Sequence, residues 1–179
     1  MVYVFLADGF EEVEALTPVD YLRRAGLEVC CVGVTGKKVT GSHNIVVESD
    51  VELKNLDCEL NGAMVVLPGG LKGTQNLNSD ENVIKILKKA NEVGSLAAIC
   101  AAPSILGRLN FLVGKKACCY PGFEKFLTGA FVVNEKVVVC ENVITSKGVG
   151  TAQQFSFEIV NFLLGNEFGL KLQKEVQWL

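Results

Sequence analysis

The chain has 179 residues and a formal net charge of −3, with 49% apolar residues, 21% charged residues, and 18 glycines against 4 prolines. This length fits one domain over residues 1–179 with a substantial buried core, and the composition is typical of a folded protein rather than a disordered one. No basic block is longer than a pair of Lys or Arg residues, which argues against nucleic-acid binding.

The chain opens with a predicted strand at residues 2–6. This segment lacks the basic start of a signal peptide and reaches an acid at Asp8. No apolar run approaches the roughly 18 residues that a membrane helix needs. We therefore expect a cytoplasmic protein without membrane contact. The chain has seven cysteines, an odd number, and no C-x-x-C motif, so we expect the cysteines to be reduced. With a single histidine, we expect no zinc cluster.

Three acids, Glu11, Glu12 and Glu14, open a predicted helix that runs to about Ala25. Carboxylates at a helix N-terminus are favourable, and the simplest interpretation is that all three are solvated. Helical geometry nevertheless points Glu14 in a different direction from its neighbours. Pro18 lacks the N–H that would bond the Glu14 carbonyl, so the helix should loosen or kink there. We hypothesise that this kink helps to project Glu14 over the ends of the strands.

Apolar runs and helical patterns then alternate along the chain. Strands are predicted at residues 28–34, 63–67, 95–99 and 143–145, and helices at 80–93, at 151–164 and from Pro103 onward. This alternation predicts an α/β fold of the doubly wound kind, with a mostly parallel sheet and helices on both faces. Two short β-rich excursions are predicted at about 36–48 and 131–140, and residues 132–139 read as a hairpin.

The two longest helical patterns each predict a buried stripe. In the helix at 80–93 the stripe comprises Val83, Leu87 and Ala90. In the helix at 151–164 it comprises Phe155, Ile159, Phe162 and Leu163. Adjacent cysteines, Cys30-Cys31 and Cys118-Cys119, lie in apolar strand-like runs and are expected to be packing residues.

The turn Gly69-Gly70 follows the strand at 63–67. It lies at the carboxyl end of that strand, where open α/β folds place their functional sites. It either simply connects a strand to a helix or supplies half of an oxyanion hole. In the second case the N–H groups of Gly70 and Ala101 would act together. The glycines here and at 148–150 fit no phosphate-binding motif.

The most informative stretch is the one around Cys100, where a strand, a sharp turn and a helix follow one another. Such an elbow lifts a nucleophile off the sheet, and the N-terminus of the following helix favours the thiolate. The alternative is a buried structural cysteine at a strand end. This stretch alone leaves both interpretations open.

Taken together, these motifs resemble the ThiJ/PfpI superfamily, in the branch that contains the Parkinson-disease-associated protein deglycase. The matching segments are Glu11–Glu14, Thr17–Asp20, Arg23–Gly26, Val66–Gly70, Gln75–Leu77, Ala98–Pro103 and Thr145–Thr151. The resemblance that they carry extends over nearly the whole chain. The resemblance implies a flavodoxin-like fold and a single domain of the class I glutamine amidotransferase-like type, usually as a homodimer. It also implies that Cys100 is the reactive cysteine, that Glu14 is its partner, and that no metal or organic cofactor is needed.

The chain departs from the family pattern at two positions. Tyr120 stands where the family often has a histidine, and His43 stands where many relatives carry an arginine. Tyrosine is a poor base near neutral pH, which weakens a Cys–His protease or amidase interpretation. His43 is better explained as an exposed hairpin residue than as a catalyst. We retain Gly69, Tyr120 and His43 as candidates for substrate binding.

The resemblance implies a glyoxalase or protein deglycase. The Cys100 thiolate would attack methylglyoxal or a related 2-oxoaldehyde to form a hemithioacetal, Glu14 would shuttle a proton, and hydrolysis would release lactate. Early glycation adducts on protein side chains would react likewise. Because two neighbouring negative charges repel, we expect Glu14 to keep its proton and to donate it in a hydrogen bond to the thiolate. The alternative function is an oxidative-stress sensor or redox-regulated chaperone that uses an oxidisable Cys100.

Overall fold

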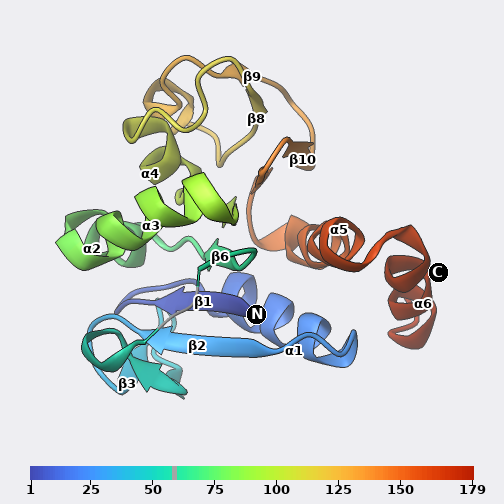
Figure 1. Ribbon diagram of the computed structural model, residues 1–179, viewed down its shortest axis with the longest axis horizontal. Coiled ribbons are helices and arrows are strands. Elements are labelled where there is room, and N and C mark those ends of the chain that lie inside the picture. Colours follow the sequence, from blue (N-terminus) through green and yellow to red (C-terminus); the bar gives the residue numbers. More distant parts are fainter. Residues whose placement is uncertain (58–59) are drawn as a thin grey trace.

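The computed structural model describes residues 1–57 and 60–179 and has a seven-stranded sheet at its centre (Figure 1). The strand order is β10-β11-β7-β6-β1-β2-β5. The strands are β1 (Val2–Leu6), β2 (Val29–Gly33), β5 (Val51–Glu52), β6 (Met64–Leu67), β7 (Ser95–Ile99), β10 (Val137–Cys140) and β11 (Val143–Ser146). Neighbouring strands are parallel except for the antiparallel pair β10–β11. This confirms the predicted mostly parallel sheet.

Helices cover both faces of the sheet. Because side chains alternate along β1, Val2, Val4 and Leu6 pack in one core layer, and Tyr3 and Phe5 pack in the other. The first layer is covered by α1 (Glu12–Arg24), α5 (Ala152–Leu164) and α6 (Asn166–Glu175). The second is covered by α2 (Leu71–Ser79), α3 (Glu81–Val93) and α4 (Pro103–Arg108). Among the described residues, three short 3-10 helices lie at Leu53–Asn55, Glu124–Phe126 and Val149–Thr151.

The helical stripes are confirmed for α3 and in part for α5. Val83, Leu87 and Ala90 are fully buried, and Asp80 caps α3 by accepting hydrogen bonds from two backbone N–H groups. In α5, Phe155 and Ile159 are buried, but Phe162 is 39% exposed and Leu163 is half-buried. The prediction was wrong for Phe162. The reason is that α5 also packs against α1 and the C-terminus: its Phe157 ring contacts Tyr21 and Trp178, which turns the buried face away from Phe162.

The two β-rich excursions have different outcomes. The first forms an antiparallel hairpin of β3 (Lys38–Thr40) and β4 (Val46–Glu48), as predicted. The second is not a hairpin: β9 (Phe131–Val132) pairs in parallel with β8 (Lys116–Ala117), whereas β10 extends the main sheet by pairing with β11. β10 pairs with the buried strand β11 over four residue pairs. The local sequence pattern of residues 132–139 does not predict this partner.

Two further expectations concern cysteines and membranes. The cysteines that the structure describes are free, and Cys58 lies outside the described residues. Cys118 and Cys119 are buried, although β8 ends one residue before them. Among the helices of the described chain, none combines the length and the apolarity that crossing a bilayer requires.

Candidate active site at the carboxyl ends of the strands

A pocket of about 1190 Å³ opens at the carboxyl ends of the strands. Its lining includes the first turn of α1, the turn after β6, the elbow after β7, the segment around Tyr120 and the loop before α5. The sequence-predicted residues Glu14, His43, Gly70, Cys100, Ala101 and Tyr120 all line it. The folded chain therefore gathers into one cavity residues that are far apart in sequence.

Cys100 stands at the apex of the predicted elbow. Its φ of 65° lies in the left-handed region, which costs a non-glycine residue on the order of 1 kcal/mol. Two backbone hydrogen bonds hold it there: the Cys100 N–H donates to the Ser146 carbonyl at 2.9 Å, and the Tyr120 N–H donates to the Cys100 carbonyl at 2.8 Å. β11 and the segment after β8 thus fix the strained residue, and the strand–turn–helix prediction is confirmed.

Two backbone N–H groups converge on the Cys100 sulfur. They belong to Ala101 and Gly70, the pair predicted as an oxyanion hole, and each hydrogen bond lowers the pKa of the thiol. Gly70 has a φ of 84°, and a β-carbon there would stand 2.3 Å from the Gly9 carbonyl oxygen. Only glycine therefore allows this N–H to reach the sulfur.

Glu14 is fully buried on the first turn of α1 and points into the site, as the helical geometry suggested. Its Oε2 accepts a hydrogen bond from the Gly69 N–H at 2.9 Å. A β-carbon at Gly69 would stand 2.5 Å from that oxygen and 3.1 Å from Cys100 Sγ, so glycine lets the carboxyl and the thiol adjoin. α1 continues through Pro18, whose part in aiming Glu14 stays a hypothesis.

Burial and mutual repulsion govern the ionisation of this pair. Burial raises the pKa of Glu14 to about 7, with a further contribution from the charge of Glu11, while the Gly69 N–H and a hydrogen bond with Cys100 lower it. Burial, followed by the charge and hydrogen bond of Glu14, raises the pKa of Cys100 to about 12. Two such groups titrate as a unit, so between these values the pair carries one negative charge and one proton.

This electrostatic picture corrects one inference from the sequence. The elbow alone predicted a thiol that ionises easily. Beside an ionised Glu14 the opposite holds, because burial and the adjacent carboxylate outweigh the two N–H donors of Gly70 and Ala101. The thiolate therefore depends on where the one remaining proton of the pair resides.

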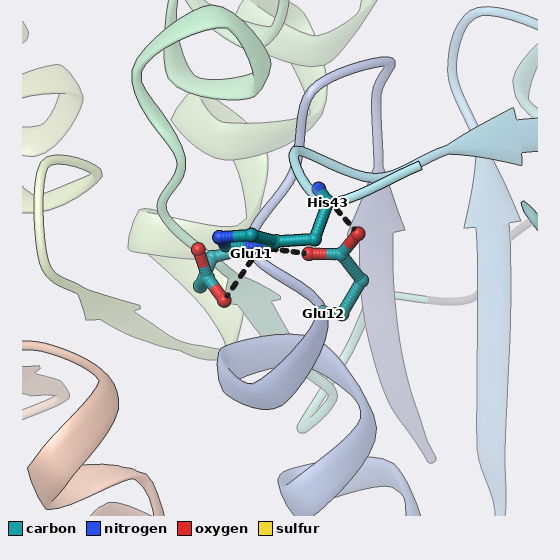
Figure 2. Close-up of side chains that lie close together, drawn as sticks. All are labelled: Glu11, Glu12 and His43. Carbon is teal, nitrogen blue, oxygen red and sulfur yellow. Dashed lines mark hydrogen bonds and ion pairs between the residues drawn. The ribbon is translucent and has the colours of Figure 1, made fainter. Parts of the chain in front are cut away.

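A second cluster lies at the rim of the pocket and joins α1 to the β3–β4 hairpin (Figure 2). His43 Nδ1 lies 3.0 Å from Glu12 Oε2 and 3.6 Å from Glu11 Oε1. The Ser42 hydroxyl is within hydrogen-bond distance of both carboxylates, at 3.0 Å from Glu11 and 3.1 Å from Glu12. The His43 side chain is 69% exposed, in agreement with its prediction as a hairpin residue.

Glu12 is buried, and its carboxylate is well supplied with donors. Its Oε1 accepts the backbone N–H groups of His43 at 2.7 Å and Ile45 at 3.4 Å. Burial raises the pKa of Glu12, but the hydrogen bond from the His43 side chain and several backbone N–H groups outweigh it and lower the pKa to about 2. The hydrogen bond to Glu12 in turn raises the pKa of His43. The cluster therefore ties the hairpin to α1 over the pocket.

Within residues 1–57 and 60–179, these three side chains are also the grouping that could best hold a metal ion. One ligand atom from each of Glu11, Glu12 and His43 lies within 4.8 Å of the others. Glu12 already accepts hydrogen bonds on both oxygens from the hairpin. The three side chains therefore already serve as a structural contact between α1 and the hairpin.

Two features of the pocket were not predicted from the sequence. Lys136 and Lys147 line the pocket, as does the acidic first turn of α1. Nothing in the local sequence around these two lysines distinguishes them from surface lysines. Gly148 adjoins the site directly: a β-carbon there would stand 3.3 Å from Tyr120 Cδ2 and 3.8 Å from Glu14 Oε1. The Gly-x-Gly pattern at 148–150 was the available signal: it fits no phosphate-binding motif and lies in the family-matching segment Thr145–Thr151, but no role in the site was predicted for Gly148.

Comparison with known proteins yields a family and several similar chains. Residues 1–162 match the DJ-1/PfpI family. The Parkinson disease protein 7 homolog of Danio rerio is 36% identical over 95% of this chain and 93% of that protein. A glutathione-independent glyoxalase of Caenorhabditis elegans is 32% identical over 88% of this chain and 84% of that protein. A deglycase of Pyrococcus abyssi is 31% identical over 90% and 98%, respectively.

Longer relatives and solved structures complete the comparison. Protein DJ-1 homolog B of Arabidopsis thaliana is 37% identical over 93% of this chain, but the match spans 39% of that protein. The crystal structure of Drosophila melanogaster DJ-1beta superposes with a TM-score of 0.91 at 34% identity, covering 98% of this chain and 96% of that one. Oxidized Toxoplasma gondii DJ-1 gives a TM-score of 0.92 at 28% identity, covering 98% and 97%.

Proposed function

Since the chain belongs to the DJ-1/PfpI family, we propose that it is a cysteine-dependent, cofactor-independent glyoxalase or protein deglycase. Its substrates are methylglyoxal-type 2-oxoaldehydes and their early glycation adducts on protein side chains. The observation that carries the proposal is the meeting of Cys100, Glu14 and two backbone N–H donors in one pocket. The names of the worm and archaeal relatives, a glyoxalase and a deglycase, support the reaction class.

The reactive form of the pair has the proton on Glu14 and the negative charge on Cys100. The pair carries one proton over a broad pH range, and the Gly70 and Ala101 N–H groups favour charge on the sulfur. Gly69 favours charge on the carboxylate through its single N–H. Moving the proton along the hydrogen bond between the two groups then interconverts a resting form and a nucleophilic form at no change in net charge.

The reaction follows from this form of the pair. The thiolate of Cys100 forms a bond to the aldehyde carbon, and the carbonyl electron pair moves to oxygen, where the Gly70 and Ala101 N–H groups stabilise it. Glu14 gives its proton to that oxygen, which yields a hemithioacetal. The carboxylate then takes the hydrogen of C1 as a proton and delivers it to the C2 oxygen, which gives an enediol. It next takes the proton of the C1 hydroxyl and delivers a proton to C2, so that C1 becomes the carbonyl of a thioester and C2 carries the hydroxyl. Water hydrolyses the thioester and frees the thiol, so methylglyoxal plus water becomes lactate.

The remaining candidates have supporting parts in substrate binding. Gly69 keeps Glu14 and Cys100 adjacent, because any side chain there would occupy the space between them. Tyr120 lines the pocket and is half exposed, and His43 lies at its rim. In this proposal Tyr120 provides an apolar wall for the substrate and takes no part in proton transfer.

The direct test measures D-lactate formed from methylglyoxal. Wild type should turn over, whereas Cys100→Ser and Glu14→Gln should lose nearly all activity. Cys140→Ser is the matched control, because Cys140 is a half-buried free cysteine on β10 outside the pocket lining and should retain full activity. A substantial residual rate in Cys100→Ser would eliminate Cys100 as the nucleophile.

A second candidate function is redox sensing at the same cysteine. It is favoured by the accessibility of Cys100 from the pocket and by the similarity to a DJ-1 described as oxidized. The thiolate would attack one oxygen of hydrogen peroxide and release water to give a sulfenate, and a second peroxide would give the sulfinate. If wild type forms no lactate but Cys100 gains two oxygen atoms under mild peroxide, this function replaces the first.

We also propose that the protein acts as a homodimer, as the family resemblance implies. Apolar side chains that would suit an interface lie exposed around the pocket mouth, among them Val13 of α1 and Ile45 of the hairpin. Light scattering of the purified protein should give twice the mass of the 19.3 kDa chain. A Val13→Asp variant should shift the distribution toward the monomer, and a monomeric wild type would refute the proposal.

A further inference from the structure

Apolar side chains stand exposed in the wall of the pocket that contains Cys100. Three of them come from separate elements: Leu71 begins α2, Tyr120 lies shortly after β8, and Val149 lies in the loop before α5. Their exposed fractions are 62%, 50% and 48%, respectively. Single exposed apolar residues are common, but several that share one cavity mark a binding surface. The pocket therefore offers an apolar surface to the molecule that it binds.

The backbone places these three side chains beside the reacting cysteine. Leu71 directly follows Gly70, whose N–H bonds the Cys100 sulfur. The Tyr120 N–H donates to the Cys100 carbonyl at 2.8 Å. The Tyr120 ring lies against the residue before Val149, where a β-carbon would stand 3.3 Å from the ring. A group attached to a carbon that reacts with Cys100 therefore lies within reach of all three.

The pocket is also much larger than the smallest substrate requires. Its volume of about 1190 Å³ corresponds to the upper end of the range for drug-sized ligands, whereas methylglyoxal has only three carbons. We propose that Leu71, Tyr120 and Val149 form an apolar subsite that selects 2-oxoaldehydes with an aromatic substituent over methylglyoxal. Phenylglyoxal is the simplest such substrate, and its ring can pack against Tyr120. This inference rests on the proposed function and names the substrate class of the same site.

The charges in the pocket favour a neutral substituent. Above the Glu14 pKa of about 7, the catalytic pair carries one negative charge, and the acidic first turn of α1 adds further carboxylates to the lining. Lys136 and Lys147 line the pocket too, but the Lys147 ammonium already donates to the Asn134 side chain. A neutral ring therefore fits this lining better than an anionic group. Comparison of phenylglyoxal with 4-carboxyphenylglyoxal separates the two possibilities.

Turnover of the two aldehydes tests the subsite. By the steps proposed above, phenylglyoxal plus water becomes mandelate, as methylglyoxal plus water becomes lactate. Because pockets discriminate even one methylene group by about 10-fold or more, we expect wild type to have a kcat/KM for phenylglyoxal at least about 10-fold above that for methylglyoxal. A ratio of one or less would overturn the inference. So would a higher kcat/KM for 4-carboxyphenylglyoxal than for phenylglyoxal, which would assign the substituent to the lysines.

Variants of the exposed side chains separate the subsite from the intrinsic reactivity of the aldehydes. Val149→Ser should lower the ratio of the two kcat/KM values by about threefold or more, and Leu71→Ser/Val149→Ser by about 10-fold or more. Val139→Ser is the matched control, since Val139 is 45% exposed on β10 outside the pocket lining, and it should keep the wild-type ratio. Thermal unfolding shows that each variant is folded. An unchanged ratio in the double variant would overturn the inference.

Alkylation keeps the inference separate from the proposed function. Iodoacetamide and N-benzyliodoacetamide share a reactive group, and their rates at Cys100 are followed by mass spectrometry of the Cys100 peptide. Relative to their rates with N-acetylcysteine, wild type and Val139→Ser should favour the benzyl reagent, and Leu71→Ser/Val149→Ser should lose this preference. If wild type forms neither lactate nor mandelate but shows the preference, the proposed function fails and the subsite stands. If both aldehydes turn over and no variant changes either ratio, the inference fails and the proposed function stands.

Light scattering of the double variant addresses a different occupant, a second copy of the chain. The double variant should keep the mass of the wild-type protein, because the subsite serves the substrate. A shift to the monomer with no change in the aldehyde ratio or the alkylation ratio would assign Leu71 and Val149 to the interface and would overturn the inference.

Discussion

Glu12 and Glu14 are two buried carboxylates two residues apart on α1, and their surroundings differ in one respect. Glu12 faces the β3–β4 hairpin and receives hydrogen bonds on both oxygens, so its pKa falls to about 2 despite burial. Glu14 faces the pocket, receives one backbone N–H and keeps one oxygen unpartnered, so burial raises its pKa to about 7. The supply of donors, and not burial alone, separates a structural carboxylate from one available for proton transfer.

The largest expected effect concerns the chemistry assigned to Glu14. Glu14→Gln keeps the size of the side chain but removes the exchangeable proton. Because general acid–base catalysis contributes typically 10²–10⁴-fold, we expect kcat/KM for methylglyoxal to fall by about that factor. Glu12→Gln, the matched variant two residues away on the same helix, should retain most of the wild-type turnover at a temperature where the variant is folded. Similar losses in both variants would break the distinction between the two carboxylates.

The same substitution should stabilise the fold at alkaline pH. A carboxyl whose folded pKa is raised contributes stability that is fully present below its ordinary value of 4.5 and is lost as pH rises through about 7. Glu14→Gln removes this loss. At pH 8 the free energy of unfolding should therefore exceed that of wild type by about 3 kcal/mol, and the difference should shrink toward pH 5. Urea unfolding at both pH values measures it, and a variant less stable than wild type at pH 8 would contradict the sign.

Glu12 should show the reverse behaviour. A lowered pKa contributes stability that is present above 4.5 and is lost as pH falls toward about 2. Glu12→Gln should cost about 2 kcal/mol of unfolding free energy at pH 7, since it weakens charge-assisted hydrogen bonds to Ser42 and His43. The difference from wild type should narrow below pH 4. No loss of stability at pH 7 would show that the hairpin does not depend on this carboxylate.

His43→Ala should have the smallest effect, because the His43 side chain is largely exposed. The raised pKa of His43 means that its contribution is present below its ordinary value of 6.5 and fades as pH rises through the folded value. The Tm difference between wild type and His43→Ala should therefore be larger at pH 6 than at pH 9, and smaller than that of Glu12→Gln at either. A larger difference at pH 9 would reverse the assigned sign.

The comparison of the two glutamates also shows what the sequence can predict. Helical geometry turned Glu14 away from its neighbours and toward the site, because helical position is a local property. The burial of Glu12 was not predictable in this way. It depends on Ser42 and His43, whose hairpin lies about thirty residues away in sequence and reaches α1 only in the folded chain.

The rest of the molecule shows the same contrast between features set by local sequence and features set by tertiary packing. Strands β1, β2, β6, β7 and β11 were predicted within about a residue of each end, since each is a buried apolar run bounded by turn residues. The pairing of β10 with β11 and the exposure of Phe162 were missed, because both depend on neighbours that are chosen by tertiary packing. The ionisation of Cys100 was missed for a related reason: local sequence indicates the elbow but not the desolvation around the thiol.

The central claim is that Cys100 and Glu14 share one proton and that the reactive form carries its charge on sulfur. The most direct test is the pH dependence of Cys100 alkylation by iodoacetamide in wild type and in Glu14→Leu, which has no proton to share. The rate for wild type should rise through a pH near the value of about 7 at which the pair loses its first proton. In Glu14→Leu the rise should move upward, to or beyond the ordinary thiol pKa of about 8.5. A wild-type rate that stays low up to pH 9, together with a downward shift in Glu14→Leu, would contradict the claim.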